Sequence, residues 1–101
     1  MFLFYRTTLD SADVLAAADT FFPAQPLGLS LSKDGGGPRE RTYSGTLGTA
    51  KVRVRSEGGH YTFVEADTSA EGESRLDRGV KNYFTRLHRL ADPRYALGAS
   101  Y

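Results

Sequence analysis

The sequence predicts an α+β protein in which an antiparallel meander sheet is covered on one face by two helices. Residues 49–55 and 60–67 place alternate side chains on opposite faces, which is typical of strands with one buried face. Residues 74–91 carry the longest apolar stripe at helical spacing. Short strands in series with flanking helices favour a two-layer fold, here in the order β-α-β-β-β-β-α.

The length and composition indicate the number of domains and the cellular compartment to expect. A chain of 101 residues is expected to form one domain, residues 1–93, followed by a C-terminal tail, residues 94–101. The net charge of +1 favours no charged partner, and the absence of cysteine excludes disulfides and thiolate chemistry. No stretch approaches the roughly 18 apolar residues of a membrane span, so we expect a cytoplasmic protein without a membrane partner.

The first half of the chain is expected to form two strands and a helix. Residues 2–8 are aromatic and β-branched, as in a strand. Asp10 or Ser11 can cap a helix whose apolar stripe continues to Phe22, and Pro23 ends it. Residues 27–33 alternate, with their leucines on one face, and predict the second strand. The glycine-rich residues 34–38 predict a hairpin loop.

The second half is expected to supply three strands and the long helix. Residues 39–46 predict the third strand, and the glycines at 58 and 59 form the turn between the last two. Ser74 and Asp77 form a capping-box pattern for the helix, which Asp92-Pro93 stops. Gly79 is the residue that disfavours this helix, because a glycine in a helix interior costs about 1 kcal/mol of helix stability relative to alanine.

A resemblance to a known family accompanies this order of elements. The residues that carry it are Thr7 to Ser11 before a short helix, the hairpin of Gly48–Arg55 and Gly58–Asp67, and the closing helix Leu76–Ala91. They resemble a reduced helix-grip domain of the START or polyketide-cyclase-like superfamily, and the order is also similar to the TATA-binding-protein-like fold. The resemblance implies binding of an apolar small molecule. The chain is shorter than the helix-grip family usually is, which implies an open sheet that could close by dimerisation.

The first functional hypothesis is a non-enzymatic binding module. The aromatic side chains exceed what one core stripe needs, so a second set is available for an apolar ligand or a second subunit in a homodimer. We expect this site on the sheet face turned away from the helices or beside the long helix. The candidate ligand-binding residues are Tyr43, Tyr61, Phe63, Glu65 and Tyr83.

Two alternatives stay open. A basic and aromatic strand face could bind nucleic acid, with Arg41, Lys51, Arg53 and Arg55 as the candidate residues. The same pattern is also routine for the solvated side of an antiparallel strand. The other alternative is a structural subunit that docks through its tail, residues 94–101.

The sequence names no catalytic or metal site. His60 and His88 are the only histidines, and neither has a spacing to a second ligand that suits a metal. No nucleophile and base, or pair of carboxylates, can be assigned. The sequence therefore favours a binding role without a cofactor over an enzyme.

Overall fold

The computed structural model describes residues 1–26, 30–69 and 74–92, and it confirms the α+β class and the predicted order of elements. The predicted tail, residues 94–101, lies outside this part of the chain. The elements are β1 (Phe2–Thr7), α1 (Ser11–Phe21), β2 (Ser32–Gly37), β3 (Glu40–Gly45), β4 (Gly48–Glu57), β5 (Tyr61–Thr68) and α2 (Arg75–Ala91).

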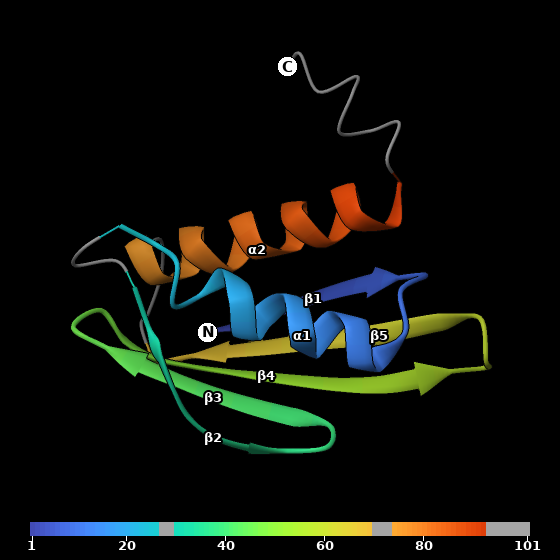
Figure 1. Ribbon diagram of the computed structural model, residues 1–101, viewed down its shortest axis with the longest axis horizontal. Coiled ribbons are helices and arrows are strands. Elements are labelled where there is room, and N and C mark those ends of the chain that lie inside the picture. Colours follow the sequence, from blue (N-terminus) through green and yellow to red (C-terminus); the bar gives the residue numbers. More distant parts are fainter. Residues whose placement is uncertain (27–29, 70–73, 93–101) are drawn as a thin grey trace.

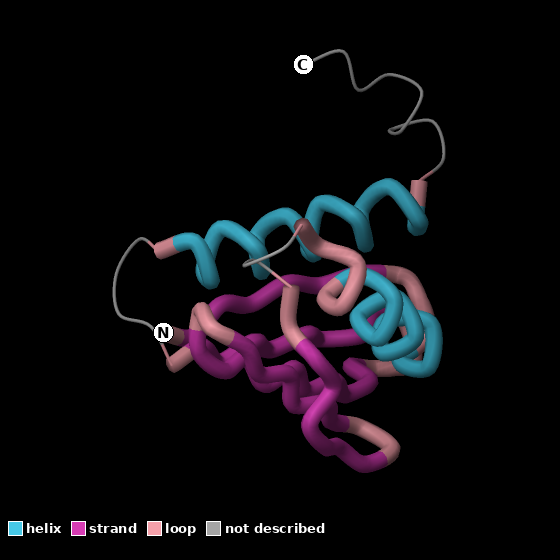
Figure 2. The backbone as a smooth tube through the Cα atoms, turned by 60° about the vertical axis from the view of Figure 1, so that its left-hand side comes forward, coloured by secondary structure: helices cyan, strands magenta, loops and turns pink. Residues whose placement is uncertain are grey.

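The five strands form one antiparallel sheet in the order β1-β5-β4-β3-β2. The four later strands follow one another as a meander, and α1 carries the chain from β1, at one edge, to β2 at the other (Figure 1). Both helices pack on the same face of the sheet, as Figures 1 and 2 show from two directions. The opposite face, called here the open face, has no helix on it among the described residues.

The core lies between the helices and the sheet. β4 and β5 line it with small and β-branched side chains, because alternate residues of each strand point toward the helices. Leu15 and Ala18 of α1 and Leu87 of α2 pack on that surface. The helix-facing residues of these two strands are Ala50, Val52, Val54, Thr62, Val64, Ala66 and Thr68.

The predicted cap of α2 is confirmed and extends into the core. The Ser74 hydroxyl accepts a hydrogen bond from the Asp77 amide at 3.1 Å and donates one to the Asp77 carboxylate at 3.0 Å. The other oxygen of this carboxylate accepts from the Thr68 hydroxyl of β5 at 2.6 Å. Asp77 is 1% exposed, so its carboxylate holds the capping Ser74 hydroxyl and fixes the start of the helix against the sheet.

The second strand corrects the sequence analysis. The predicted loop at residues 34–38 is largely strand, because β2 extends to Gly37 and the turn is formed by residues 38 and 39. β2 is an edge strand with a bulge between Lys33 and Gly35. Gly36 has φ of 146°, and a Cβ there would collide with the Glu40 carbonyl oxygen. Gly36 is therefore needed because the β3 backbone lies too close to leave room for a Cβ. Residues 27–29 of the predicted strand lie outside the described residues.

Candidate functional site

The open face brings together three of the predicted ligand-binding residues. Tyr61, Phe63 and Glu65 alternate along β5 and all point away from the helices. β1 lies beside them and adds Phe2 and Phe4, which the sequence analysis did not single out. Phe4 lies opposite Glu65 in the register and Phe2 lies opposite Asp67.

The aromatic side chains of this face form a row. The Phe2 and Phe4 rings are stacked with centroids 6.3 Å apart, and Phe4 approaches Phe63 to 5.5 Å. Two guanidinium groups flank the Phe63 ring, with Cζ of Arg55 at 4.5 Å and Cζ of Arg6 at 5.7 Å from its centroid. Phe2 and Phe4 remain 55% and 57% exposed, so their rings are available to a partner.

The predicted basic strand face is present but is neutralised by acidic neighbours. Nε of Arg53 lies 3.0 Å and Nζ of Lys51 lies 3.8 Å from the Glu40 carboxylate. Nε of Arg6 lies 2.8 Å from the Glu57 carboxylate. Among the described residues, the open face carries charged side chains of both signs, since Arg6, Lys51, Arg53 and Arg55 face it together with Glu40, Glu57, Glu65 and Asp67. The N-terminal ammonium group lies 3.8 Å from the Asp67 carboxylate.

The expected placement of Tyr43 and Arg41 on the open face is wrong. In the β3–β4 register, Tyr43 lies opposite Ala50 and Arg41 opposite Val52, and both point toward the helices. Tyr43 is fully buried against Phe22, with ring centroids 4.8 Å apart. The small side chain of Ala50 leaves room for the Tyr43 ring on that face.

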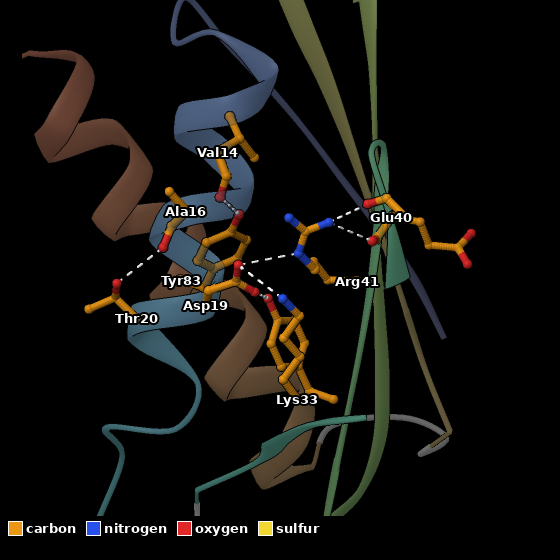
Figure 3. Close-up of polar contacts among 10 residues, drawn as sticks. Val14, Ala16, Asp19, Thr20, Lys33, Glu40, Arg41 and Tyr83 are labelled. Atoms are coloured by element: carbon orange, nitrogen blue, oxygen red, sulfur yellow. Dashed lines mark hydrogen bonds and ion pairs between the residues drawn. The ribbon is translucent and has the colours of Figure 1, made fainter. Parts of the chain in front are cut away.

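Tyr83 also belongs to the core and does not meet the open face. Its ring packs against Phe22 with centroids 5.1 Å apart, and its hydroxyl donates to the Val14 carbonyl oxygen at 2.7 Å (Figure 3). Burial raises the pKa of Tyr83 far above its usual range, with the Asp19 charge as a smaller cause. The hydroxyl is therefore a fixed donor that ties α2 to α1.

A polar cluster around Asp19 ties α1 to the edge hairpin. The Tyr43 hydroxyl donates to Oδ1 of Asp19 at 2.7 Å, and Nε of Arg41 donates to Oδ2 at 3.2 Å. Nζ of Lys33 lies 3.6 Å from Oδ2 (Figure 3). Burial alone would raise the pKa of Asp19, but these hydrogen bonds and positive charges outweigh it and lower the pKa. The cluster links strands β2 and β3 to the helix layer.

A cavity of about 440 Å³ lies on the helix side, between the end of α1 and the first half of α2. We call it the α1–α2 cavity. Polar side chains of α2, Arg75, Arg78 and Asn82, contribute to its wall. Gly79 lies between them in the helix. The remaining lining residues are Phe21, Phe22, Gln25, Leu31, Leu47 and Leu76.

The two histidines lie in different elements, His60 in a turn and His88 in α2. His60 is exposed in the turn after β4, and Nδ1 of His88 lies 3.3 Å from the Tyr5 hydroxyl. Within residues 1–26, 30–69 and 74–92, no group of three or more His, Cys, Asp or Glu side chains could hold a metal ion. In the same part of the chain, no helix has the length and apolar character needed to cross a membrane.

Comparison of the chain with models of known protein families, with curated proteins and with solved structures finds no match. The fold and the geometry of the two candidate sites therefore define the class: a small two-layer α+β protein with an open aromatic sheet face and a separate cavity under its long helix.

Proposed function

We propose that the protein is a binding module that holds a small amphiphilic anion in the α1–α2 cavity. The apolar body of the ligand lies among the phenylalanine and leucine side chains, and its anionic group meets the arginines of α2. The sequence analysis expected an apolar ligand either on the open face or beside the long helix. The cavity favours the helix side, where Tyr43 and Tyr83 also lie, because only a concave site can enclose a small molecule.

The dimensions and the lining support such a ligand. Pockets that enclose small molecules have volumes of roughly 300–1,000 Å³ and combine apolar walls with few polar groups. The α1–α2 cavity, at about 440 Å³, falls in this range. Among the described residues neither Arg75 nor Arg78 has an ion-pair partner, so both guanidinium groups can pair with a carboxylate or sulfonate.

The observation that carries the proposal is Gly79. A glycine in a helix interior costs about 1 kcal/mol relative to alanine. Close packing does not require it, because a Cβ built on Gly79 meets no heavy atom within 4 Å. Its φ is not positive either, so the backbone does not require glycine. What the glycine provides is open space in the wall of the cavity, at a cost in helix stability.

The test is a fluorescence titration with anilinonaphthalene sulfonate, which is an apolar ring system with one anionic group. Gly79→Leu should weaken binding by at least about tenfold, or 1.4 kcal/mol, because its side chain extends into the cavity. Gly79→Ala is the graded comparison: one methyl group takes up part of the space, so this variant should bind more weakly than the parent but less weakly than Gly79→Leu, while unfolding at a higher temperature. Equal binding by the Gly79→Leu and parent proteins would contradict the proposal.

The charge arm of the test uses Arg75→Gln with Arg78→Gln. This double variant should lose affinity for decanoate and keep affinity for decanol, because only the carboxylate needs a guanidinium partner. The double variant Tyr61→Ala with Phe63→Ala changes the open face and should leave both affinities unchanged. Loss of probe binding in that variant would move the ligand to the open face.

The nucleic-acid alternative has less support. Phosphate binding needs a net positive surface, whereas Lys51 and Arg53 share the Glu40 carboxylate and Arg41 points toward Asp19 on the other side of the sheet. The tail-docking alternative concerns residues outside the described part of the chain.

A further inference from the structure

The open face holds large aromatic side chains that the fold itself does not bury. Phe2, Phe4 and Tyr61 are 55%, 57% and 53% exposed. The Phe2–Phe4–Phe63 row is continuous across β1 and β5. A contiguous apolar patch rimmed by charged residues marks an interaction surface, whereas single exposed apolar side chains do not.

The charges of this face favour a self-complementary partner over a polyanion. Among the described residues its cations are interleaved with carboxylates, and several ion pairs already form within the chain, such as Arg53–Glu40 at 3.0 Å and Arg6–Glu57 at 2.8 Å. A polyanion would have to break these pairs and would meet the carboxylates. A second copy of the same face offers each charge a partner of opposite sign.

Two groups of opposite sign on this face are left over. Arg55 lies over the Phe63 ring, and neither Arg55 nor Glu65 forms an ion pair with any described residue. They occupy neighbouring strands at different levels of the register, since Glu65 lies opposite Arg53 and Arg55 lies opposite Phe63. If two sheets stack about a two-fold axis that lies between them, Glu65 of one copy can face Arg55 of the other, and Arg55 of the first copy then faces Glu65 of the second.

We propose that two copies of the chain pack their open faces together about a two-fold axis, with Glu65 of each copy paired to Arg55 of the other. Such an interface is isologous, so each pair occurs twice. Packed sheets lie about 10 Å apart, a gap that Phe2, Phe4 and Tyr61 of both copies fill. The open face then becomes the interior of a four-layer dimer with helices outside. The α1–α2 cavity is on the far side of the sheet and does not depend on this pairing.

Charge exchange tests the pairing. In Glu65→Arg, the new cation faces the partner's Arg55, and in Arg55→Glu, the new carboxylate faces the partner's Glu65. Each variant alone should therefore dimerise at least about tenfold more weakly than the parent in sedimentation equilibrium. An equimolar mixture of the two should regain a dimer, because both inter-subunit pairs are then of opposite sign. Circular dichroism checks that each variant is folded.

The outcomes separate the possible occupants of the face. If the parent protein stays monomeric at about 100 μM, its self-association is too weak for a stable homodimer and the proposal is overturned. The proposal is also overturned if the mixture of the two charge variants dissociates as easily as each variant alone. Phe4→Ser should also weaken the dimer, because the side chain is exposed in the monomer and buried in the pair. Tight binding of single-stranded DNA by the monomer would assign the face to nucleic acid. Gly79→Leu should leave the dimer intact, so failure of the cavity proposal would not affect this one.

Discussion

The two faces of the sheet are built from the same strands but from different side chains. Toward the helices, β4 and β5 present alanine, valine and threonine, which fit beneath the helices at native packing density. Away from them, the same strands present Tyr61, Phe63 and a series of charged residues. The helix-facing surface is fully used by folding, whereas the aromatic surface is not. This difference is the basis of the proposal that a second copy of the chain covers the open face.

The largest effect should separate two tyrosines on opposite faces. Tyr43 on β3 is fully buried, and Tyr61 on β5 is 53% exposed. Tyr43→Ala should lower the free energy of unfolding by about 3–5 kcal/mol, because it leaves a cavity beside Phe22 and removes the donor to Asp19. Tyr61→Ala should change it by less than about 0.5 kcal/mol in the monomer. Urea unfolding of both variants at low protein concentration measures the difference.

Equal destabilisation by the two tyrosine variants would contradict the division between a folding face and an interaction face. A Tyr61→Ala effect that grows with protein concentration would instead sharpen it, since that dependence is expected where the residue contributes to a dimer.

An intermediate effect is expected where the helix layer is anchored to β5. Asp77→Ala should destabilise the protein by about 1–3 kcal/mol, because it removes the carboxylate that accepts from both the Ser74 capping hydroxyl and the buried Thr68 hydroxyl. Thr68→Val added to Asp77→Ala should recover part of this loss, since the hydroxyl that lost its Asp77 acceptor is then absent. Thermal unfolding of both variants gives the comparison. No recovery in the double variant would mean that the Thr68–Asp77 bond contributes little.

The sequence could predict the elements because each leaves a local pattern. The stripe from Leu76 to Leu87 and the Ser74–Asp77 cap identify α2 without tertiary information, and the valines of β4 identify its buried face. The glycine-rich second strand could not be assigned in the same way. In most local contexts glycine indicates a turn. Gly36 is required in an edge strand because the backbone of β3 lies too close to it for a Cβ, and this contact is not visible in the sequence.

The face of Tyr43 needed the register between two strands as well as the alternation within each. One available signal is the short β3–β4 turn at residues 46 and 47, which pairs Gly45 with Gly48. Tyr43 precedes Gly45 by two residues and Ala50 follows Gly48 by two, so the two lie opposite each other, on the core face. Phe2 and Phe4 left no comparable signal, because the pairing of β1 with β5 is a contact between the two ends of the fold.

The smallest effect should distinguish two carboxylates, one on each face. Asp19 is held by Tyr43, Arg41 and Lys33, and its pKa is lowered below the ordinary value of 3.8. A depressed pKa in the folded state contributes stability that is present above about pH 4 and is lost as the pH falls through the folded value. Asp19→Asn should therefore lower stability near neutral pH by roughly 0.5–1.5 kcal/mol, and its difference from the parent should shrink in acid.

Glu40→Gln is the matched control on the open face. The Glu40 carboxylate contacts Arg53 and Lys51, but these side chains are 40%, 45% and 37% exposed, so the ion pairs are hydrated and weak. Urea unfolding from pH 7 to pH 3 should give a Glu40→Gln curve close to the parent's at every pH. If Asp19→Asn ran parallel to the parent over this range while Glu40→Gln converged with it, the carboxylate that stabilises the fold would lie on the open face. The charges of that face would then serve folding, and the argument that they are kept for a second copy would lose its basis.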